Sequence, residues 1–207
     1  MMIINKNITY LFAHGAGAPC DSEWMNYVSD KIHTMSEGCI EVKRFNFPYM
    51  NKRLLENKKY PPNKMPVLME EWKNQINKCN NSKYLFIGGK SMGGRAATKV
   101  VSENLTVNVN GIINFGFPFH APGKGPGDRI DHLENIKTPC LINQGTRDPM
   151  GSKEEILKYK LSNFVEVKYL EDGNHDLKPR IKSGLSFEDN INKAVDNMIN
   201  FITKICI

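Results

Sequence analysis

Ser91 stands in the pentapeptide Gly89-Lys90-Ser91-Met92-Gly93, which matches the pattern G-x-S-x-G. In that pattern the serine sits on a sharp turn between a strand and a helix, with its hydroxyl exposed for nucleophilic attack. Flanking glycines let the strand and helix approach closely, and the helix N-terminus offers N–H groups to an anion. A glycine-rich turn with a bystander serine is disfavoured, because the strand-like run YLFI precedes the motif and the helix-like run GRAATKVVSEN follows it.

A serine hydroxyl is a weak nucleophile at neutral pH and needs a general base within hydrogen-bonding reach. Among the five histidines, His175 stands in the polar segment EDGNHD, between a predicted strand and the last predicted helix. A loop at the carboxyl end of a strand can bring an imidazole to the serine, so we predict His175 as the base. His14 and His120 are alternatives, whereas His33 and His132 fall in helix-like stretches and are typical of surface or satisfied polar groups.

The base needs an acid to orient it, and Asp148 is the predicted one. It stands in the segment QGTRDP, directly after the strand-like run CLINQ, and so at the carboxyl end of a predicted sheet. The histidine loop follows the next strand along the chain. Asp172 and Asp176 are local rivals, although a direct neighbour of His175 rarely reaches its ring. An Asp-Pro turn or a helix cap is the alternative interpretation of Asp148.

Acyl transfer also requires two N–H donors for the oxyanion that forms when a hydroxyl attacks a carbonyl. The first donor expected is the backbone N–H of Met92, the residue after the nucleophile. The second is expected from the segment HGAGAP after the first strand-like run, where small residues allow close backbone approach. Ala16 is the predicted donor and Gly17 the alternative; a tight turn without this role would have the same composition.

Aromatic and histidine side chains stand at or just after the ends of three predicted strands and are candidates for the wall of a substrate pocket. These candidates are His14, Phe47, Tyr49, Phe119 and His120. The alternative is that they pack in the core or beneath the loops. Lys178 and Arg180, shortly after the predicted base, would attract an anionic substrate or form a solvated face. No cluster has the spacing of metal ligands, so no metal is expected.

The candidate site residues can meet only if the strands before them end at the same edge of a sheet. Six short apolar runs are expected to be strands: 9–13, 40–47, 84–87, 111–117, 140–144 and 165–170. Helix-like stretches alternate with them: 22–35, 66–79, 94–103, 152–161 and 187–205. The alternation predicts an α/β fold, with a doubly wound, mostly parallel sheet of about six strands and helices on both faces. Two Pro-rich stretches, 46–64 and 117–128, are expected to be irregular loops near the site.

Composition indicates the class of protein. With 207 residues, 40% of them hydrophobic and 24% charged, we expect one globular domain over residues 1–207. The net charge is +6, but basic residues are scattered, so nucleic acid is not an expected partner. Five cysteines without a C-x-x-C pattern fit a reduced, cytoplasmic protein without a disulfide framework. We identify no signal peptide and no apolar run long enough for a membrane span.

Five segments in order, HGAGAP, GKSMGG, FGFPFHAPGK, QGTRDP and GNHDLKPR, resemble the small, capless α/β-hydrolases. More narrowly, they resemble the dienelactone-hydrolase-like branch that contains testis-expressed hydrolase-like proteins and a subunit of a histone-acetylating complex. The resemblance covers nearly the whole chain from Thr9. It implies a catalytic triad of Ser91, Asp148 and His175, in the order along the chain that this fold requires, and no cofactor.

Two departures from the family pattern bear on these expectations. Only eight residues precede Thr9, so the antiparallel opening hairpin of larger relatives is expected to be absent or reduced. Dienelactone hydrolases use a cysteine nucleophile, whereas residue 91 is Ser, which argues against that substrate.

We therefore expect a serine hydrolase that cleaves a carboxylic ester or thioester of a small or exposed acyl group through an acyl-enzyme. A small-molecule acyl substrate is the expected partner, and the oligomeric state is left open. The alternative is a non-catalytic protein-interaction module on the same fold. Two nucleotide-binding patterns fail, because the first glycine of a phosphate-binding loop would fall at Tyr84 and the third glycine of a dinucleotide fingerprint at Cys20.

Overall fold

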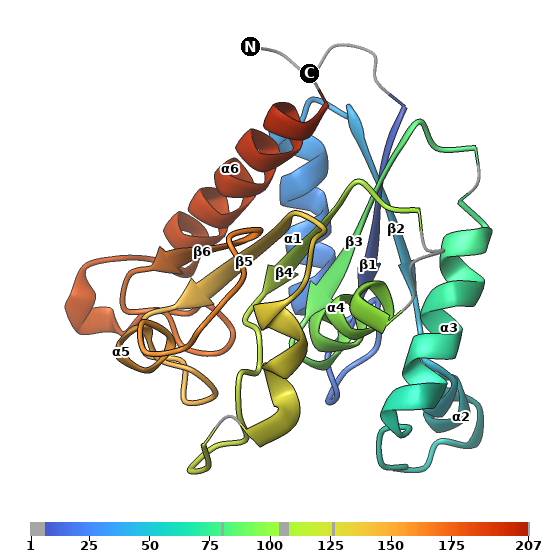
Figure 1. The fold of residues 1–207 in the computed structure, drawn as a ribbon, viewed down its shortest axis with the longest axis horizontal. Coiled ribbons are helices and arrows are strands. Elements are labelled where there is room, and N and C mark those ends of the chain that lie inside the picture. Colours follow the sequence, from blue (N-terminus) through green and yellow to red (C-terminus); the bar gives the residue numbers. More distant parts are fainter. Residues whose placement is uncertain (1–6, 80, 104–107, 126, 207) are drawn as a thin grey trace.

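Six parallel strands form one sheet in the computed structural model, which describes residues 7–79, 81–103, 108–125 and 127–206 (Figure 1). The strands are β1 (Ile8–Ala13), β2 (Ile40–Phe45), β3 (Tyr84–Lys90), β4 (Gly111–Phe115), β5 (Cys140–Gly145) and β6 (Val165–Leu170). Their order across the sheet is β2-β1-β3-β4-β5-β6, and each described pair is parallel. The predicted doubly wound α/β fold is confirmed.

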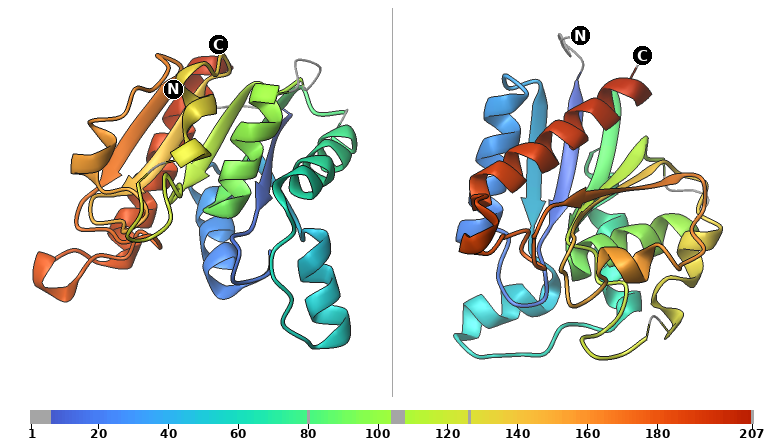
Figure 2. Two further views of the ribbon diagram at one scale, coloured as in Figure 1. Left: turned by 60° about the horizontal axis from the view of Figure 1, so that its bottom comes forward. Right: turned by 90° about the vertical axis from the view of Figure 1, so that its left-hand side faces the viewer.

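Helices cover both faces of the sheet (Figure 1 and Figure 2). They are α1 (Glu23–Met35), α2 (Pro48–Glu56), α3 (Met65–Asn77), α4 (Met92–Glu103), α5 (Lys153–Ile156) and α6 (Phe187–Ile205), with short 3-10 helices at Gly127–Arg129, Asp131–Glu134 and Ile181–Ser183. Apolar side chains of α1 and α6 form the core on one face, and those of α3 and α4 form it on the other. Between the described strands, the chain carries no inserted cap domain.

The order of strands reverses beside β1, and this reversal positions the site. The chain passes from β1 to β2 on one side and then to β3 on the other. Ala13 of β1 lies opposite Gly89 of β3, and Phe115 of β4 lies opposite Lys90. The segments after β1 and β3 therefore leave the sheet side by side at its carboxyl edge. Open α/β sheets bind ligands at such a reversal.

One stretch predicted to be irregular contains a helix. Pro48–Glu56 forms α2, with Pro48 in its first turn, where the missing N–H costs nothing and the fixed φ already suits a helix. The strand before it ends at Phe45 rather than at residue 47, because the backbone of Phe47 instead precedes the helix as its N-cap.

The helix predicted at 152–161 is shorter than expected. Ser152 caps α5, which ends at Ile156. Tyr159 and Leu161, at the end of the predicted range, lie beyond the helix and pack against the core. The apolar residues at the end of this range are therefore partly buried, but they are not helical.

Helix α6 confirms the prediction made for residues 187–205. Ser186 accepts the N–H of Asp189 at 3.0 Å, and the Asp189 carboxylate accepts the N–H of Ser186 at 2.8 Å, which together make a capping box. The buried face of the helix consists of Asn190, Ile191, Ala194, Val195, Met198, Phe201 and Ile202. In the ranges that the structure describes, no helix is both long and apolar enough to cross a bilayer.

Candidate active site

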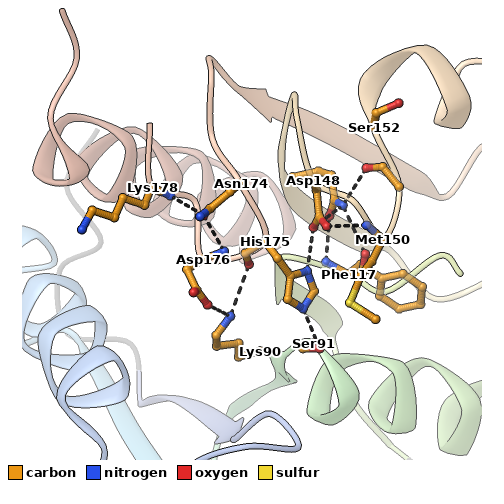
Figure 3. Close-up of polar contacts among 12 residues, drawn as sticks. Lys90, Ser91, Phe117, Asp148, Met150, Ser152, Asn174, His175, Asp176 and Lys178 are labelled. Carbon is orange, nitrogen blue, oxygen red and sulfur yellow. Dashed lines mark hydrogen bonds and ion pairs between the residues drawn. The ribbon is translucent and has the colours of Figure 1, made fainter. Parts of the chain in front are cut away.

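Ser91 occupies the turn between β3 and α4 in a left-handed backbone conformation, with a φ of 51°. Its N–H donates to the carbonyl of Phe115 at 3.2 Å, and its carbonyl accepts the N–H of Arg95 at 3.0 Å as α4 begins. A non-glycine residue in this conformation is disfavoured by roughly 1–3 kcal/mol. The neighbouring strand and helix hold the strained residue, and its side chain faces His175 (Figure 3).

Glycines around Ser91 allow this turn to press against β1. A Cβ at Gly89 would come within 2.5 Å of the Ala13 carbonyl oxygen, and one at Gly93 within 2.6 Å of the His14 carbonyl oxygen. Real Cβ atoms do not approach oxygen so closely, so both positions require glycine. The glycines of G-x-S-x-G are therefore explained by the close packing of β3, α4 and β1.

A continuous hydrogen-bond chain links Ser91, His175 and Asp148 (Figure 3). Nε2 of His175 lies 2.8 Å from the Ser91 hydroxyl, and Nδ1 of the same ring lies 2.7 Å from Oδ2 of Asp148. The Asp148 side chain is fully buried, whereas that of His175 is 21% exposed. The structure thus brings together the three residues that the sequence predicted to meet.

Asp148 is held by two further donors. The side-chain amide of Gln144 donates to Oδ2 at 2.9 Å, and the Met150 N–H donates to Oδ1 at 2.8 Å. Gln144 also accepts the N–H of Phe117 at 2.7 Å, which ties the loop after β4 to the same carboxylate. Gln144 was not among the predicted site residues, although a polar side chain at the end of an apolar strand run signals a buried hydrogen-bonding role.

A second buried carboxylate anchors the base of the loop that carries His175. Asp172 accepts the Nε–H of Arg180 at 2.9 Å and the backbone N–H of Arg180 at 2.7 Å, and it pairs with Nε of Arg147 at 2.9 Å. The hydrogen bonds from Arg180, helped by the charge of Arg147, outweigh burial and hold the pKa of Asp172 well below its usual range. Asp172 is therefore engaged as an anchor, and Asp148 is the acid that contacts the imidazole.

Replacing Asp172 by Asn is expected to lower the melting temperature at neutral pH. It is also expected to make the melting temperature fall less steeply as the pH is lowered. Because the folded-state pKa is depressed, the carboxylate stabilises the wild type above its unfolded pKa of about 3.9, and this contribution is lost as the pH falls below that value. Thermal unfolding of both proteins from about pH 7 to about pH 2.5 measures the effect. The difference between their melting temperatures should narrow below about pH 4, and a constant difference would contradict the prediction.

The segment after β1 is fixed by side chains beneath it. His14 accepts the N–H of Phe47 at Nε2, at 3.1 Å, so its Nδ1 carries the proton and donates to the Gly15 carbonyl at 2.6 Å. The Tyr49 hydroxyl donates to the Ala16 carbonyl at 3.1 Å. Tyr49 belongs to α2, so this helix helps to hold the segment after β1 in place.

These bonds set the direction of two backbone N–H groups. In a trans peptide unit the C=O and N–H groups point in opposite directions, so the N–H groups of Ala16 and Gly17 point away from the side chains that bind the preceding carbonyls. A Cβ at Gly15 would lie 3.6 Å from Cβ of Ser91, which places this loop against the turn that carries Ser91. Met92 is the first residue of α4, where an N–H has no partner within the helix. Both predicted donor segments therefore lie beside Ser91.

The alternative bases, His14 and His120, have other partners. Burial, together with the charge of Arg53, lowers the pKa of His14 and so favours its neutral form. The ring of His120 is almost fully buried, with Nε2 3.4 Å from the Glu155 carboxylate. His175 is the histidine whose ring contacts the Ser91 hydroxyl.

The predicted pocket residues are all buried. Their exposed fractions are 3% or less: His14, Phe47, Tyr49, Phe119 and His120. They pack beneath the loops, and their contact with substrate stays a prediction. A hollow of about 560 Å³ lies beside the His175 loop, lined by Glu23, Trp24, Tyr27, Asp176, Lys178, Ser186, Phe187 and Glu188. Its wall comes mainly from α1 and the start of α6, and neither Ser91 nor His175 is among the residues that line it.

The polar groups at this site suit proton transfer. The Ser91 hydroxyl is hydrogen-bonded to an imidazole, and the Asp148 carboxylate accepts hydrogen bonds from Gln144, Met150 and that imidazole. A hydroxyl proton can therefore pass to a base that a carboxylate orients.

A group of three or more His, Cys, Asp or Glu side chains placed to hold a metal ion is absent from the residues that the structure describes.

Comparison with known proteins points to the same fold. A family model described as an alpha/beta hydrolase domain matches residues 6–203. An alpha-beta serine hydrolase homologue from Coxiella burnetii is 18% identical, with a TM-score of 0.69 over 94% of this chain and 86% of that one. The protein Est1E from Butyrivibrio proteoclasticus is 11% identical, with a TM-score of 0.67 over 96% and 89% of the two chains.

A dienelactone hydrolase from Anabaena variabilis is 16% identical, with a TM-score of 0.65 over 94% of this chain and 87% of that one. Likeness to solved structures at such low identity establishes a shared fold. The family model spans nearly the whole sequence, and the chain therefore belongs to the alpha/beta hydrolase domain family.

Proposed function

We propose that this protein is a serine hydrolase in which Ser91 is the nucleophile, His175 the general base and Asp148 the acid that orients the base. The observation that carries the proposal is the unbroken pair of short hydrogen bonds from the serine hydroxyl to a fully buried carboxylate. Membership of the hydrolase family supports the activity class, as does likeness to a serine hydrolase homologue and a dienelactone hydrolase.

In the proposed reaction, Nε2 of His175 takes the hydroxyl proton while Oγ of Ser91 attacks the carbonyl carbon of the substrate. Asp148 keeps Nδ1 protonated and stabilises the imidazolium that forms. The imidazolium then gives its proton to the leaving alcohol or thiol as the bond to the carbonyl carbon breaks, which leaves an acyl-enzyme. Water attacks the acyl-enzyme with His175 as base, and the acid is released as Ser91 recovers its proton.

Backbone N–H groups hold the negative charge of the tetrahedral intermediate in this mechanism. Met92 supplies one donor and Ala16 the other, with Gly17 as the alternative. The carbonyl groups of Gly15 and Ala16 are tied down by His14 and Tyr49, which supports this assignment because it orients the N–H groups before substrate arrives.

The proposed substrate is a carboxylic ester or thioester with a small acyl group, or an acyl group exposed on a larger partner. A serine at position 91 sets this chain apart from dienelactone hydrolases, which use a cysteine. A strong preference for long-chain lipid esters would overturn this substrate proposal.

We also propose that the chain is a single cytoplasmic domain of the branch that contains the testis-expressed hydrolase-like proteins.

Covalent labelling with a fluorophosphonate probe tests the proposed mechanism. Wild type is expected to form one adduct, mapped to Ser91 by peptide mass, whereas Ser91→Ala and His175→Ala are expected to form none. His33→Ala changes an exposed histidine on α1 and should be labelled like wild type. A folded wild type without an adduct would overturn the proposal and favour a non-catalytic interaction module.

A further inference from the structure

Lys90, the residue before Ser91, connects the nucleophile turn to the histidine loop (Figure 3). Its ammonium group donates to the His175 carbonyl at 3.2 Å and pairs with Oδ1 of Asp176 at 2.5 Å. It also lies over the ring of Trp24, with Nζ 4.8 Å from the centroid. The pattern G-x-S-x-G leaves this position unspecified, yet the side chain is only 14% exposed.

The histidine loop has to cross a large part of the sheet to reach Ser91. His175 follows β6, whereas Ser91 follows β3, and strands β4 and β5 lie between them. The anchor at Asp172 fixes the base of the loop on its own side of the sheet. At the tip, the indole N–H of Trp24 donates to the Asp176 carbonyl at 3.1 Å. The tip therefore receives contacts from Trp24 and Lys90, on the far side of the sheet from the anchor at its base.

We propose that Lys90 is a positioning residue that fixes the distance between His175 and Ser91, an inference that rests on the proposed serine-hydrolase function. Lys90 is the last residue of β3, which is paired with strands on both sides, and Ser91 is the next residue. A bond from Lys90 to the backbone of His175 therefore ties the base and the nucleophile to the same short segment. The ion pair with Asp176 fixes the next residue as well, so the imidazole has little freedom to swing away from the hydroxyl.

The charges around Lys90 agree with this role. A largely buried ammonium is unfavourable unless it is paired, and Lys90 has a carboxylate, a carbonyl and an aromatic face around it. Burial raises the pKa of Asp176, but Lys90 and other nearby cationic groups outweigh it, so the pKa is lowered and the carboxylate stays ionised. Asp176 thus faces Lys90 and not the imidazole, which explains why it does not serve as the orienting acid.

Substitution of Lys90 tests the proposal by labelling kinetics. Lys90→Met keeps the length of the side chain but removes its charge and donors, and its second-order rate of fluorophosphonate labelling is expected to fall about 10- to 100-fold, as for a displacement of about 1 Å at a reacting group. Lys90→Arg, which keeps both charge and donors, should restore most of the rate. Lys31→Met is the matched control, because Lys31 also pairs with a carboxylate and lies over an aromatic ring, but on α1. It should be labelled like wild type.

A spectroscopic measurement separates positioning from a general effect on stability. The Nδ1 proton of His175, hydrogen-bonded to a buried carboxylate, is expected to give a resolved downfield resonance in wild type. Well below the unfolding temperature, that resonance should broaden or vanish in Lys90→Met and return in Lys90→Arg. A side chain that merely stabilised the fold would lower the melting temperature and leave the resonance in place.

The outcomes distinguish this inference from the proposed function. If Lys90→Met is labelled at the wild-type rate and keeps the resonance, the positioning role is wrong while the serine-hydrolase proposal stands. If wild type forms no adduct, the proposed function fails, and a resonance that survives in Lys90→Met overturns the positioning role as well. Slower labelling of Lys90→Met together with loss of the resonance, both restored by Lys90→Arg, supports the proposal.

Discussion

Replacing Asp148 by Asn is expected to lower the rates of fluorophosphonate labelling and of ester hydrolysis by about 10⁴-fold. The carboxylate accepts hydrogen bonds from His175, Gln144 and Met150 in a fully buried site. An amide has one acceptor oxygen, so its NH₂ must face either Met150 at the Oδ1 position or both His175 and Gln144 at the Oδ2 position. With the NH₂ toward His175, the ring proton moves to Nε2, which can then no longer accept the proton of Ser91. With the NH₂ toward Met150, two buried donors oppose each other.

Hydrolysis of a p-nitrophenyl ester and the labelling rate measure this effect on protein that is shown to be folded. Asp196→Asn is the matched control, because Asp196 lies on the exposed face of α6 and its substitution should leave both rates unchanged. A loss of less than about tenfold for Asp148→Asn would mean that the buried carboxylate does not set the tautomer of His175.

Replacing Gly88 by Ala is expected to destabilise the fold by more than about 4 kcal/mol, and so to abolish soluble expression. Gly88 lies opposite Ile113 in the pairing of β3 with β4. A Cβ at this position would lie 1.8 Å from the Ile113 carbonyl oxygen and 2.7 Å from its carbonyl carbon. Both atoms belong to the backbone of the neighbouring strand, so the two strands would have to separate in the centre of the sheet.

The yield of soluble protein and the melting temperature measure the effect of Gly88→Ala. Gly125→Ala is the control, because a Cβ there would meet no atom within 4 Å and its φ is not in the left-handed region. A Gly88→Ala protein with a melting temperature close to that of wild type would show that β3 and β4 can part at this point.

The sheet was predictable because its strands are short apolar runs separated by helix-like stretches. Strands β4 and β5 are buried at every position, as expected of strands covered on both faces. Helix α6 was predictable from its apolar spacing and its cap. Helix α2 was not, because only Tyr49 and Met50 of its nine residues are buried, which leaves almost no apolar periodicity to detect.

The meeting of Ser91, Asp148 and His175 was predictable because each follows a strand, and the carboxyl ends of parallel strands share one edge of the sheet. The roles of Gln144 and Lys90 depend instead on tertiary contacts that leave no local pattern. Lys90 and the His175 carbonyl that it binds are 85 residues apart in the sequence.

The residues that line the hollow beside the His175 loop were harder to predict for a related reason. An aromatic residue after a strand can face either the core or the solvent, and the packing of the loop decides between them. Phe47 and Phe119 face the core, whereas Trp24 and Phe187, within helix-like stretches, line the hollow.

The relay between Ser91, His175 and Asp148 joins residues that are 84 and 27 positions apart. Its base comes from the loop after β6, the last strand of the sheet. A chain that leaves the ribosome can therefore form the turn around Ser91 well before His175 has been added to the chain. Contacts of such long sequence separation form late in folding. In the proposed mechanism Ser91 therefore stays unreactive until the loop that carries His175 has been made and folded, and reaction of Ser91 with a probe reports that this stage has been reached.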